Sequence, residues 1–459
     1  MDTNHAQNAI DLSEGDCNQS YFRRLWDTEQ IDAKTRHWLA EDQIHFLHQS
    51  LSTPCLNVLK SCQGSVITDL QDRAYLDFHG NNVHNVGFGN PDVIAAIIDQ
   101  LQTLSFCTRR YTNLPAVTLA GKLAALAPGN LNKVLFAPGG TTAIGMALKL
   151  ARIATGRFKT ISLWGAFHGA SLDAISIGGE AMFRKHIGPL LPGAEHAPPP
   201  DPYRCLWNQI GDCEGCGLKC AKYIEYMLEM EKDVSAVIAE PIRSTTVHLP
   251  PPGYWDVVRQ ACDRHGALLI FDETGIGMGR SGRMFAAEVF NVTPDILTLG
   301  KSLGGGIFPL AAVIARENMD IASESAIGHY THEKNPTACR AGMAAIQYIE
   351  EKKLADRSES LGRYVVEQMK HLMTCHPLVG DVRGKGLLFG LELVKDRESK
   401  VPASIEAEQV MYACLRRGLN FKVSQGNVLT FTPPLTVSES ELDQAFDILD
   451  AALTETENG

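Results

Sequence analysis

Short apolar runs alternate with helix-like segments through the middle of the chain. Between about residues 115 and 315 the apolar runs are KVLFAP, KTISLW, VSAVIAEPI, ALLIFDE, DILTLG and LAAVIA, and segments such as TTAIGMALKLARIATG and YWDVVRQACDRHG separate them. Runs of this length between amphipathic helices are typical of parallel strands covered on both faces. The pattern predicts an α/β domain over residues 115–330 with a mostly parallel sheet and with functional loops beyond the carboxyl ends of its strands.

The segments on either side of this domain predict a smaller α+β part. Residues 1–50 carry apolar positions at helical intervals and predict an N-terminal helical arm. Residues 51–114 contain short apolar runs and a turn, followed by an amphipathic helix that begins near Pro91. Residues 331–459 contain three helical stretches and the short strands LLFGLELV and VLTFTPP. We therefore expect both ends of the chain to build the small domain.

Composition excludes some classes of protein without identifying a partner. The chain has 459 residues, of which 44% are apolar and 21% charged, as in soluble globular proteins with more than one domain. Its net charge of −11 provides no basic field for nucleic acid. The first residues lack both a basic start and an apolar run, so we expect no secretory signal, no membrane contact and a cytoplasmic location.

Four of the twelve cysteines lie close together in the sequence. Cys205, Cys213, Cys216 and Cys220 would offer four thiolates to a zinc ion, but only Cys213 and Cys216 have the C-x2-C spacing of a zinc ribbon. The other cysteines are scattered and mostly stand in apolar segments, which favours reduced thiols over disulfides. The prediction is an insertion loop with ordinary thiols and no metal, and a zinc site stays open as the alternative.

Lys301 stands directly after the apolar run DILTLG and shortly before three glycines. A lysine at the end of a strand, with small neighbours, can reach a bound ligand. The segment GKS also resembles part of a phosphate-binding loop, but that motif requires a glycine where Asp295 stands. Lys301 is therefore a candidate for covalent chemistry and not for nucleoside triphosphate binding.

Asp272 ends the apolar run ALLIFD, and a Gly-Gly-Thr-Thr segment follows the run KVLFAP. An acid at a strand end can pair with the protonated nitrogen of a pyridine ring, although most such acids cap the next turn. The backbone N–H groups of Gly140, Thr141 and Thr142 begin a helix and can hold a phosphate, although a glycine turn with a threonine cap gives the same pattern. The combination with Lys301 favours the functional interpretation.

Further motifs follow in order between about residues 50 and 450. They are Phe167-His168-Gly169, Glu240-Pro241, the D-E-x-x-x-G-x-G-R-x-G segment from Asp272 to Gly282, Thr331 to Pro336, Val382 to Leu387 and Pro433 to Leu435. The set resembles that of the class III aminotransferases, a branch of the fold-type I pyridoxal-phosphate enzymes. The resemblance implies a large domain with a seven-stranded sheet, a smaller α+β domain and pyridoxal 5′-phosphate as cofactor.

The resemblance also implies a role for individual residues. Lys301 would hold the cofactor covalently and would be the catalytic residue. The ring of Phe167 would stack on the cofactor, and His168 and Glu240 would belong to the same binding set. Thr331 would reach the cofactor phosphate of the partner subunit, which implies a homodimer with shared active sites.

The chain departs from the family pattern around the cofactor. The segment GGTTAI lacks the Glu and Asn that the family carries after its phosphate-binding glycine. Thr274 and Gly275 replace a Val that packs on the cofactor ring and a Gln that commonly bonds its hydroxyl group. We therefore expect phosphate binding through backbone groups and threonine hydroxyls, and a different means of orienting the ring.

A second departure concerns the substrate. The resemblance implies that Arg383 binds a substrate acid group, and in many members a Glu neutralises this Arg where Thr245 stands here. We expect Arg383 to be unpaired, Arg243 to add a second positive charge, and Arg109 or Arg110 to lie nearby. Such a site favours a dianionic head group over a single carboxylate.

These departures predict a lyase that acts on one small aminophosphonate. Some class III members are lyases of amino compounds that bear phosphate, and the expected reaction here converts 1-hydroxy-2-aminoethylphosphonate to phosphonoacetaldehyde and ammonia. The alternative is an ω-aminotransferase that uses pyruvate or 2-oxoglutarate as amino acceptor. A protein that binds the cofactor without catalysis is disfavoured, because both the Lys and the Asp needed for chemistry are present.

Overall fold

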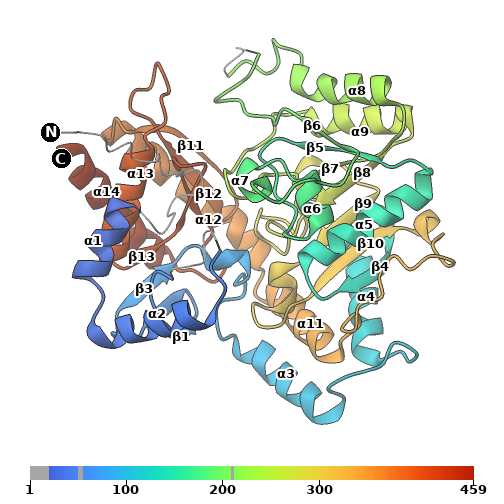
Figure 1. Cartoon of the computed structure of the whole chain (residues 1–459), viewed down its shortest axis with the longest axis horizontal. Coiled ribbons are helices and arrows are strands. Elements are labelled where there is room, and N and C mark those ends of the chain that lie inside the picture. The colour runs from blue at the N-terminus through green and yellow to red at the C-terminus, as the bar shows by residue number, and fades with distance from the viewer. Residues whose placement is uncertain (1–19, 50–54, 208–210) are drawn as a thin grey trace.

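The computed structural model describes residues 20–49, 55–207 and 211–459. In Figure 1 the blue N-terminal and red C-terminal segments lie together on the left, and most of the middle of the chain forms the right-hand part around the large sheet. Both ends of the chain thus lie together, apart from the large sheet, as the sequence predicts.

The large sheet contains seven strands within the described residues. Their order is β4 (Leu131–Ala137), β10 (Ala311–Arg316), β9 (Ile296–Leu299), β8 (Leu268–Asp272), β7 (Val234–Ala239), β5 (Lys159–Leu163) and β6 (Ala194–Ala197). Strand β10 is antiparallel to β4 and β9, and the other neighbours that pair are parallel. The predicted mostly parallel sheet is confirmed. The apolar runs did not predict β6, because its sequence AEHA is not apolar.

Alternate residues of the central strands pack into two different cores. In β7, Val237 belongs to the core that contains Trp255 of helix α9, whereas Ile238 belongs to the core that contains Ala143 of helix α5. Every residue of β7 is buried. Helices therefore cover both faces of the sheet, which explains why its strands are continuous apolar runs and leaves the strand ends as the exposed polar edge.

Both ends of the chain contribute to the smaller sheets. One has the order β1 (Leu59–Gln63), β2 (Val66–Asp69), β3 (Ala74–Asp77) and β13 (Leu419–Asn420), and the other has the order β11 (Val379–Lys385), β12 (Leu388–Leu393), β15 (Val428–Phe431) and β14 (Lys422–Ser424). Strand β13 pairs in parallel with β3, with Leu419 opposite Leu76. This pairing joins the two chain ends and explains the neighbouring blue and red segments of Figure 1.

Several helices begin where the sequence supplies a side-chain capping group. Asn90 caps α3 by accepting hydrogen bonds from two backbone N–H groups, Asn335 caps α11, and Ser438 with Glu441 forms a capping box at α14. The helices are α1 (Tyr21–Glu29), α2 (Ala33–His45), α3 (Pro91–Thr103), α4 (Leu114–Leu126), α5 (Gly140–Thr155), α6 (Leu172–Ile177), α7 (Ala181–Arg184), α8 (Lys219–Glu231), α9 (Tyr254–His265), α10 (Ala287–Phe290), α11 (Pro336–Glu351), α12 (Leu354–Cys375), α13 (Ser404–Arg416) and α14 (Glu439–Asn458).

The predicted domain boundaries can be placed on these elements. The arm predicted over residues 1–50 contains α1 and α2, and its first 19 residues lie outside the described part. Helix α3, which falls within residues 51–114, contacts α11 of the segment 331–459. Among the described residues, no helix combines the length and apolarity needed to cross a membrane. The boundaries themselves stay predictions.

Candidate active site

A cavity of about 220 Å³ opens at the carboxyl edge of the large sheet. Its walls come from loops that follow β4, β5, β7, β8 and β9. The lining residues are Gly140, Thr141, Phe167, His168, Gly169, Glu240, Arg243, Ser244, Thr245, Asp272, Thr274, Gly275 and Lys301. The cavity thus brings together most of the residues that the sequence singles out, from segments up to 161 positions apart (301 − 140).

Lys301 opens the short turn that follows β9, and its side chain is exposed to the cavity. A Cβ atom at Gly275 would lie 3.3 Å from the Lys301 amine, so the glycine keeps space beside that nitrogen. Removal of water by the surrounding protein lowers the pKa of Lys301, while the charges of Glu240 and Asp272 oppose this effect. A lowered pKa increases the fraction of neutral amine, which is the form that acts as nucleophile and base.

Asp272 is buried at the end of β8 and accepts several hydrogen bonds. His168 Nδ1 lies 2.9 Å from its Oδ2, and the Thr298 hydroxyl and the Thr274 backbone N–H donate to its Oδ1 at 3.1 and 3.0 Å. Burial alone would raise the pKa of Asp272, but the hydrogen bonds of His168 and Thr274 outweigh it and lower the pKa. Asp272 therefore stays a carboxylate and can pair with a protonated ring nitrogen.

The phosphate-binding prediction falls on the start of helix α5. Gly140 and Thr141 line the cavity, and the Thr141 hydroxyl lies 2.8 Å from that of Ser171. The Thr142 hydroxyl instead donates to the carbonyl of Gly139 at 2.6 Å, and Thr142 is outside the cavity lining. The geometry is that of a helix N-terminus open to an anion, with Thr141 as the hydroxyl that faces it.

Two further side chains shape the cavity wall. The ring of Phe167 packs against Phe183 of α7, with centroids 4.5 Å apart. The methyl group of Thr274 would lie 2.9 Å from a Cβ at Gly140 and 2.8 Å from one at Gly300, so it fills the space between these glycines. Thr274 thus provides an apolar contact where the family has Val.

Arg243 lines the cavity, but carboxylates neutralise its charge. Its guanidinium forms ion pairs with Glu240 and Glu180, and all three side chains are at most 10% exposed. Glu240 also accepts hydrogen bonds from the backbone and hydroxyl groups of Ser244. The prediction that Arg243 adds an uncompensated positive charge is wrong, because the sequence spacing does not reveal Glu180, 63 residues earlier.

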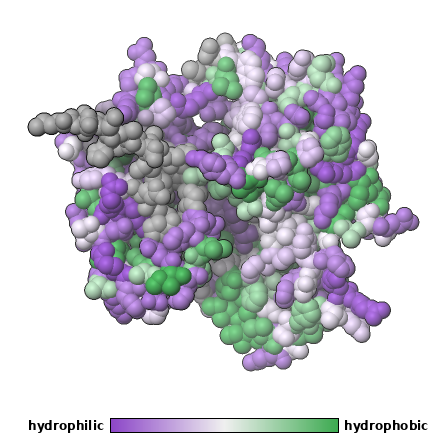
Figure 2. Space-filling view, in the orientation of Figure 1, coloured by the Kyte–Doolittle hydropathy of each residue, from purple (hydrophilic) through white to green (hydrophobic). Residues whose placement is uncertain are grey.

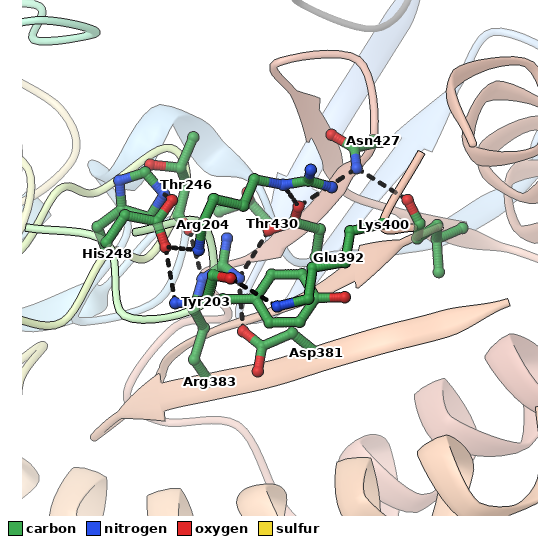
Figure 3. Close-up of polar contacts among 12 residues, drawn as sticks. Tyr203, Arg204, Thr246, His248, Asp381, Arg383, Glu392, Lys400, Asn427 and Thr430 are labelled. Atoms are coloured by element: carbon green, nitrogen blue, oxygen red, sulfur yellow. Dashed lines mark hydrogen bonds and ion pairs between the residues drawn. The ribbon is translucent and has the colours of Figure 1, made fainter. Parts of the chain in front are cut away.

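The prediction that Arg383 is unpaired is also wrong. Its Nη1 lies 2.7 Å from Asp381 and 2.8 Å from Glu392, and its Nε donates to the carbonyl of Thr246 at 2.9 Å (Figure 3). Arg204 also pairs with Glu392. Thr245 does not neutralise Arg383, but two acids of the β11–β12 hairpin do, and Arg383 is not among the cavity-lining residues.

Arg110 and Thr331 lie on exposed loops outside the cavity. The neighbouring Arg109 places Nη2 2.7 Å from Nε2 of His329, so the two loops contact each other. The structure describes one chain, and their predicted roles in a shared active site stay predictions.

Lys422 is a residue that the sequence interpretation missed. In the β14–β15 pair Lys422 lies opposite Thr430, whose hydroxyl donates to the carbonyl of cavity-lining Thr245. Cross-strand partners project from the same face of a sheet, so Lys422 projects toward the cavity wall. Its charge contributes to the lowered pKa of Lys301. No local motif marks Lys422, because sheet pairing brings it there.

The cysteine group does not form a metal centre in the described residues. No three His, Cys, Asp or Glu side chains within residues 20–49, 55–207 and 211–459 are arranged to hold a metal ion. Burial raises the pKa of Cys213, and it raises the pKa of Cys220 to about 11. The zinc alternative therefore has no preformed ligand set here.

The described residues fit pyridoxal 5′-phosphate. Lys301 can bind an aldehyde, the start of α5 can bind the phosphate, and Asp272 can pair with the ring nitrogen. In the described part of the chain, the buried atoms of cavity-lining residues that lack a hydrogen-bond partner include His168 Nε2, Thr245 Oγ1 and Thr274 Oγ1. Polar atoms of this kind are expected around a bound polar group.

Fold and site together define a pyridoxal-phosphate enzyme, and sequence comparison gives the family. The profile of the Aminotransferase class-III family matches residues 48–453. The chain belongs to this family, and pyridoxal 5′-phosphate is its cofactor.

Individual relatives cover nearly the whole chain. The (R)-1-hydroxy-2-aminoethylphosphonate ammonia-lyase of Vibrio splendidus (strain 12B01) is 45% identical over 96% of this chain and 95% of the relative. The leucine/methionine racemase of Thermococcus litoralis is 38% identical over 88% and 91%. A solved amine transaminase from an uncultivated Pseudomonas species, in its PLP-bound form, superimposes with a TM-score of 0.85 at 31% identity, over 90% of this chain and 98% of the transaminase.

Proposed function

We propose that this enzyme is an ammonia-lyase that converts (R)-1-hydroxy-2-aminoethylphosphonate to phosphonoacetaldehyde and ammonia. The observation that carries the proposal is the 45% identity to the Vibrio splendidus lyase along almost the entire chain. The cavity supports it, because an amine of lowered pKa lies between an anion-binding helix start and a buried carboxylate.

Lys301 and Asp272 have different roles in the proposed reaction: Lys301 transfers protons, and Asp272 stabilises the positive charge on the ring nitrogen. Pyridoxal phosphate, when bound, withdraws electrons from the carbon that bears the substrate nitrogen. The Lys301 amine removes the proton from that carbon and then delivers a proton to the hydroxyl group that leaves from the neighbouring carbon. Asp272 holds a negative charge against the ring nitrogen throughout. Hydrolysis of the remaining unsaturated amine gives the aldehyde and ammonia.

Lys422 and Arg243 are the proposed cations for the phosphonate. Arg383 is held by two acids, as Arg243 is, but unlike Arg243 it is not among the residues that line the cavity. Lys422 approaches from the small-domain sheet, and Arg243 lies in the cavity wall. A dianion needs about two positive partners, which an ammonium and a guanidinium can supply together.

We further propose a homodimer with shared active sites in the cytoplasm. Apolar side chains of α3 and the following residues are exposed in the single chain, including Ile98, Leu101 and Leu114. Figure 2 shows hydrophobic residues gathered on the lower part of the face where α3 lies. A patch of this kind marks an interaction surface. In the dimer, Thr331 would contact the partner's cofactor phosphate, and Arg110 would lie near a shared site.

The alternative function is that of an ω-aminotransferase, which the solved amine transaminase favours. Lys301 serves both reactions, so the cavity does not separate them. Incubation of the holoenzyme with the hydroxyaminophosphonate, without a keto acid, separates the two. The lyase releases ammonia over many turnovers, whereas an aminotransferase stops after about one turnover per site and resumes only with pyruvate or 2-oxoglutarate.

A further inference from the structure

Arg243 lies between two carboxylates that come from different segments. Its Nη1 pairs with Glu240, three residues earlier, and its Nη2 pairs with Glu180, at the start of α7. The side chains of Arg243 and Glu180 are only 10% and 9% exposed. The pairs are therefore partly removed from water, where charge interactions are strong.

A pair of glycines places Glu180 against the cavity wall. A Cβ at Gly179 would lie 2.1 Å from the carbonyl oxygen of Leu163, and the Gly179 N–H donates to the carbonyl of Ala166 at 2.8 Å. Any larger residue at position 179 would push the segment away from the end of β5. Phe183, on the same segment, packs on cavity-lining Phe167. The segment that carries Glu180 is thus part of the site's structure.

The two carboxylates are anchored differently. Glu240 belongs to the same loop as Arg243 and accepts hydrogen bonds from the Ser244 N–H at 3.0 Å and the Ser244 hydroxyl at 2.9 Å. Glu240 thus remains in place when the ligand on Arg243 changes. Glu180 comes from another segment and pairs with the second terminal nitrogen, Nη2. An anion in the cavity would have to compete with Glu180 for this side of Arg243.

We propose that Glu180 competes with the anionic group of the substrate for Arg243 and thereby sets the affinity of the site for dianions. The inference rests on the proposed function for the identity of the anion. A guanidinium binds a phosphonate through two parallel N–H groups, and a dianion displaces a carboxylate more readily than a monoanion does. Glu180 keeps the site selective for doubly charged groups and limits how tightly a dianionic product is retained.

The test measures binding of methylphosphonate, which cannot react and is a dianion at alkaline pH, to the holoenzyme by calorimetry in alkaline buffer. Glu180→Gln preserves the shape of the side chain and removes its charge, so the Kd for methylphosphonate should fall by about tenfold, as expected for loss of one charge-assisted competitor. The Kd for methanesulfonate, a monoanion of similar shape, should fall by at least the same factor, because a monoanion no longer has to displace Glu180 from Arg243. Glu180→Asp keeps the charge and should bind methylphosphonate as the unmodified enzyme does.

Two controls separate competition at Arg243 from a general change of charge. Glu214→Gln removes one negative charge from an exposed position and should leave the Kd unchanged. In an Arg243→Met background, Glu180→Gln should not lower the Kd for methylphosphonate. Unchanged or weaker methylphosphonate binding in Glu180→Gln, or an equal gain without Arg243, overturns the proposal. Glu180→Ser is the second charge-free variant if Glu180→Gln does not fold. The titration needs no turnover, so failure of the lyase assignment leaves its result interpretable.

Discussion

The two sides of the cavity differ in how their charged groups are positioned. On the sheet side, Asp272 and Lys301 follow strands directly, and each lies where its own strand ends. On the small-domain side, Arg383 and Lys422 are positioned by pairing with the neighbouring strands that carry Glu392 and Thr430. A catalytic residue at a strand end is positioned by its own strand, so substitutions elsewhere should disturb it little. The residues that contact the substrate are positioned by pairing with groups on other elements, so they are more sensitive to such substitutions.

Loss of the strand-end lysine should have the largest effect. In Lys301→Ala the rate of ammonia release should fall by more than about 10³-fold, because both the covalent attachment and the proton transfer are lost. Reduction with borohydride followed by mass spectrometry should find the cofactor attached to the Lys301 peptide in the unmodified enzyme and not in the variant. Lys185→Ala, at an exposed position, is the matched control. Near-normal activity of Lys301→Ala would contradict the assignment.

Asp272 should give the next largest effect. Asp272→Asn keeps the shape but removes the negative charge opposite the ring nitrogen, so kcat should fall by about 10²-fold or more. Thr298→Val removes only one hydrogen bond to Asp272 and should reduce kcat by less than about tenfold. Steady-state ammonia release checks both variants, and equal losses would show that the charge of Asp272 is not decisive.

Arg383 and Lys422 should respond in opposite ways. Arg383→Met leaves Asp381 without its cation and buried Glu392 with Arg204 alone, and the free energy of unfolding should fall by about 3 kcal/mol. Lys422→Met should raise the KM for the aminophosphonate by about tenfold, with a smaller loss of stability than Arg383→Met. Denaturant unfolding and steady-state kinetics separate the two. A large KM effect with unchanged stability in Arg383→Met would restore Arg383 as the substrate-binding residue.

The smallest effect is expected at His376, which contacts two acids from a distant part of the sequence. Burial alone would lower the pKa of His376, but its hydrogen bonds with Glu457 and Asp450 outweigh burial and raise the pKa. The contribution to stability is therefore complete below the pKa of the unfolded chain and is lost as the pH rises through the raised folded pKa. His376→Gln should lower Tm by roughly 1–2 °C at low pH and by less at high pH. A pH-independent difference would contradict this origin.

The residues of the candidate site fall into two groups: those whose position the sequence predicted and those whose partners it did not reveal. The order of apolar runs predicted the sheet, and the positions of Lys301, Asp272 and Gly140 at run ends placed them at one edge. Sequence interpretation failed at Arg243 and Arg383, which were expected to be unpaired, and it missed Lys422 and Glu180. Glu180 and Glu392 lie on other elements than the arginines they pair with, and neither periodicity nor motif spacing encodes that proximity. Asp381 lies on the same strand as Arg383, two residues before it.

The amino-acid sequence alone determined the fold class and the family and predicted Lys301 as the residue that binds the cofactor, because buried strands are continuous apolar runs and strand-end residues share one edge of a parallel sheet. Only the tertiary structure decided which cations are neutralised. Carboxylates 63 residues before Arg243 and nine residues after Arg383 meet them through packing of separate loops and strands. Whether a charge is free depends on distances between atoms, and only the folded chain establishes those distances.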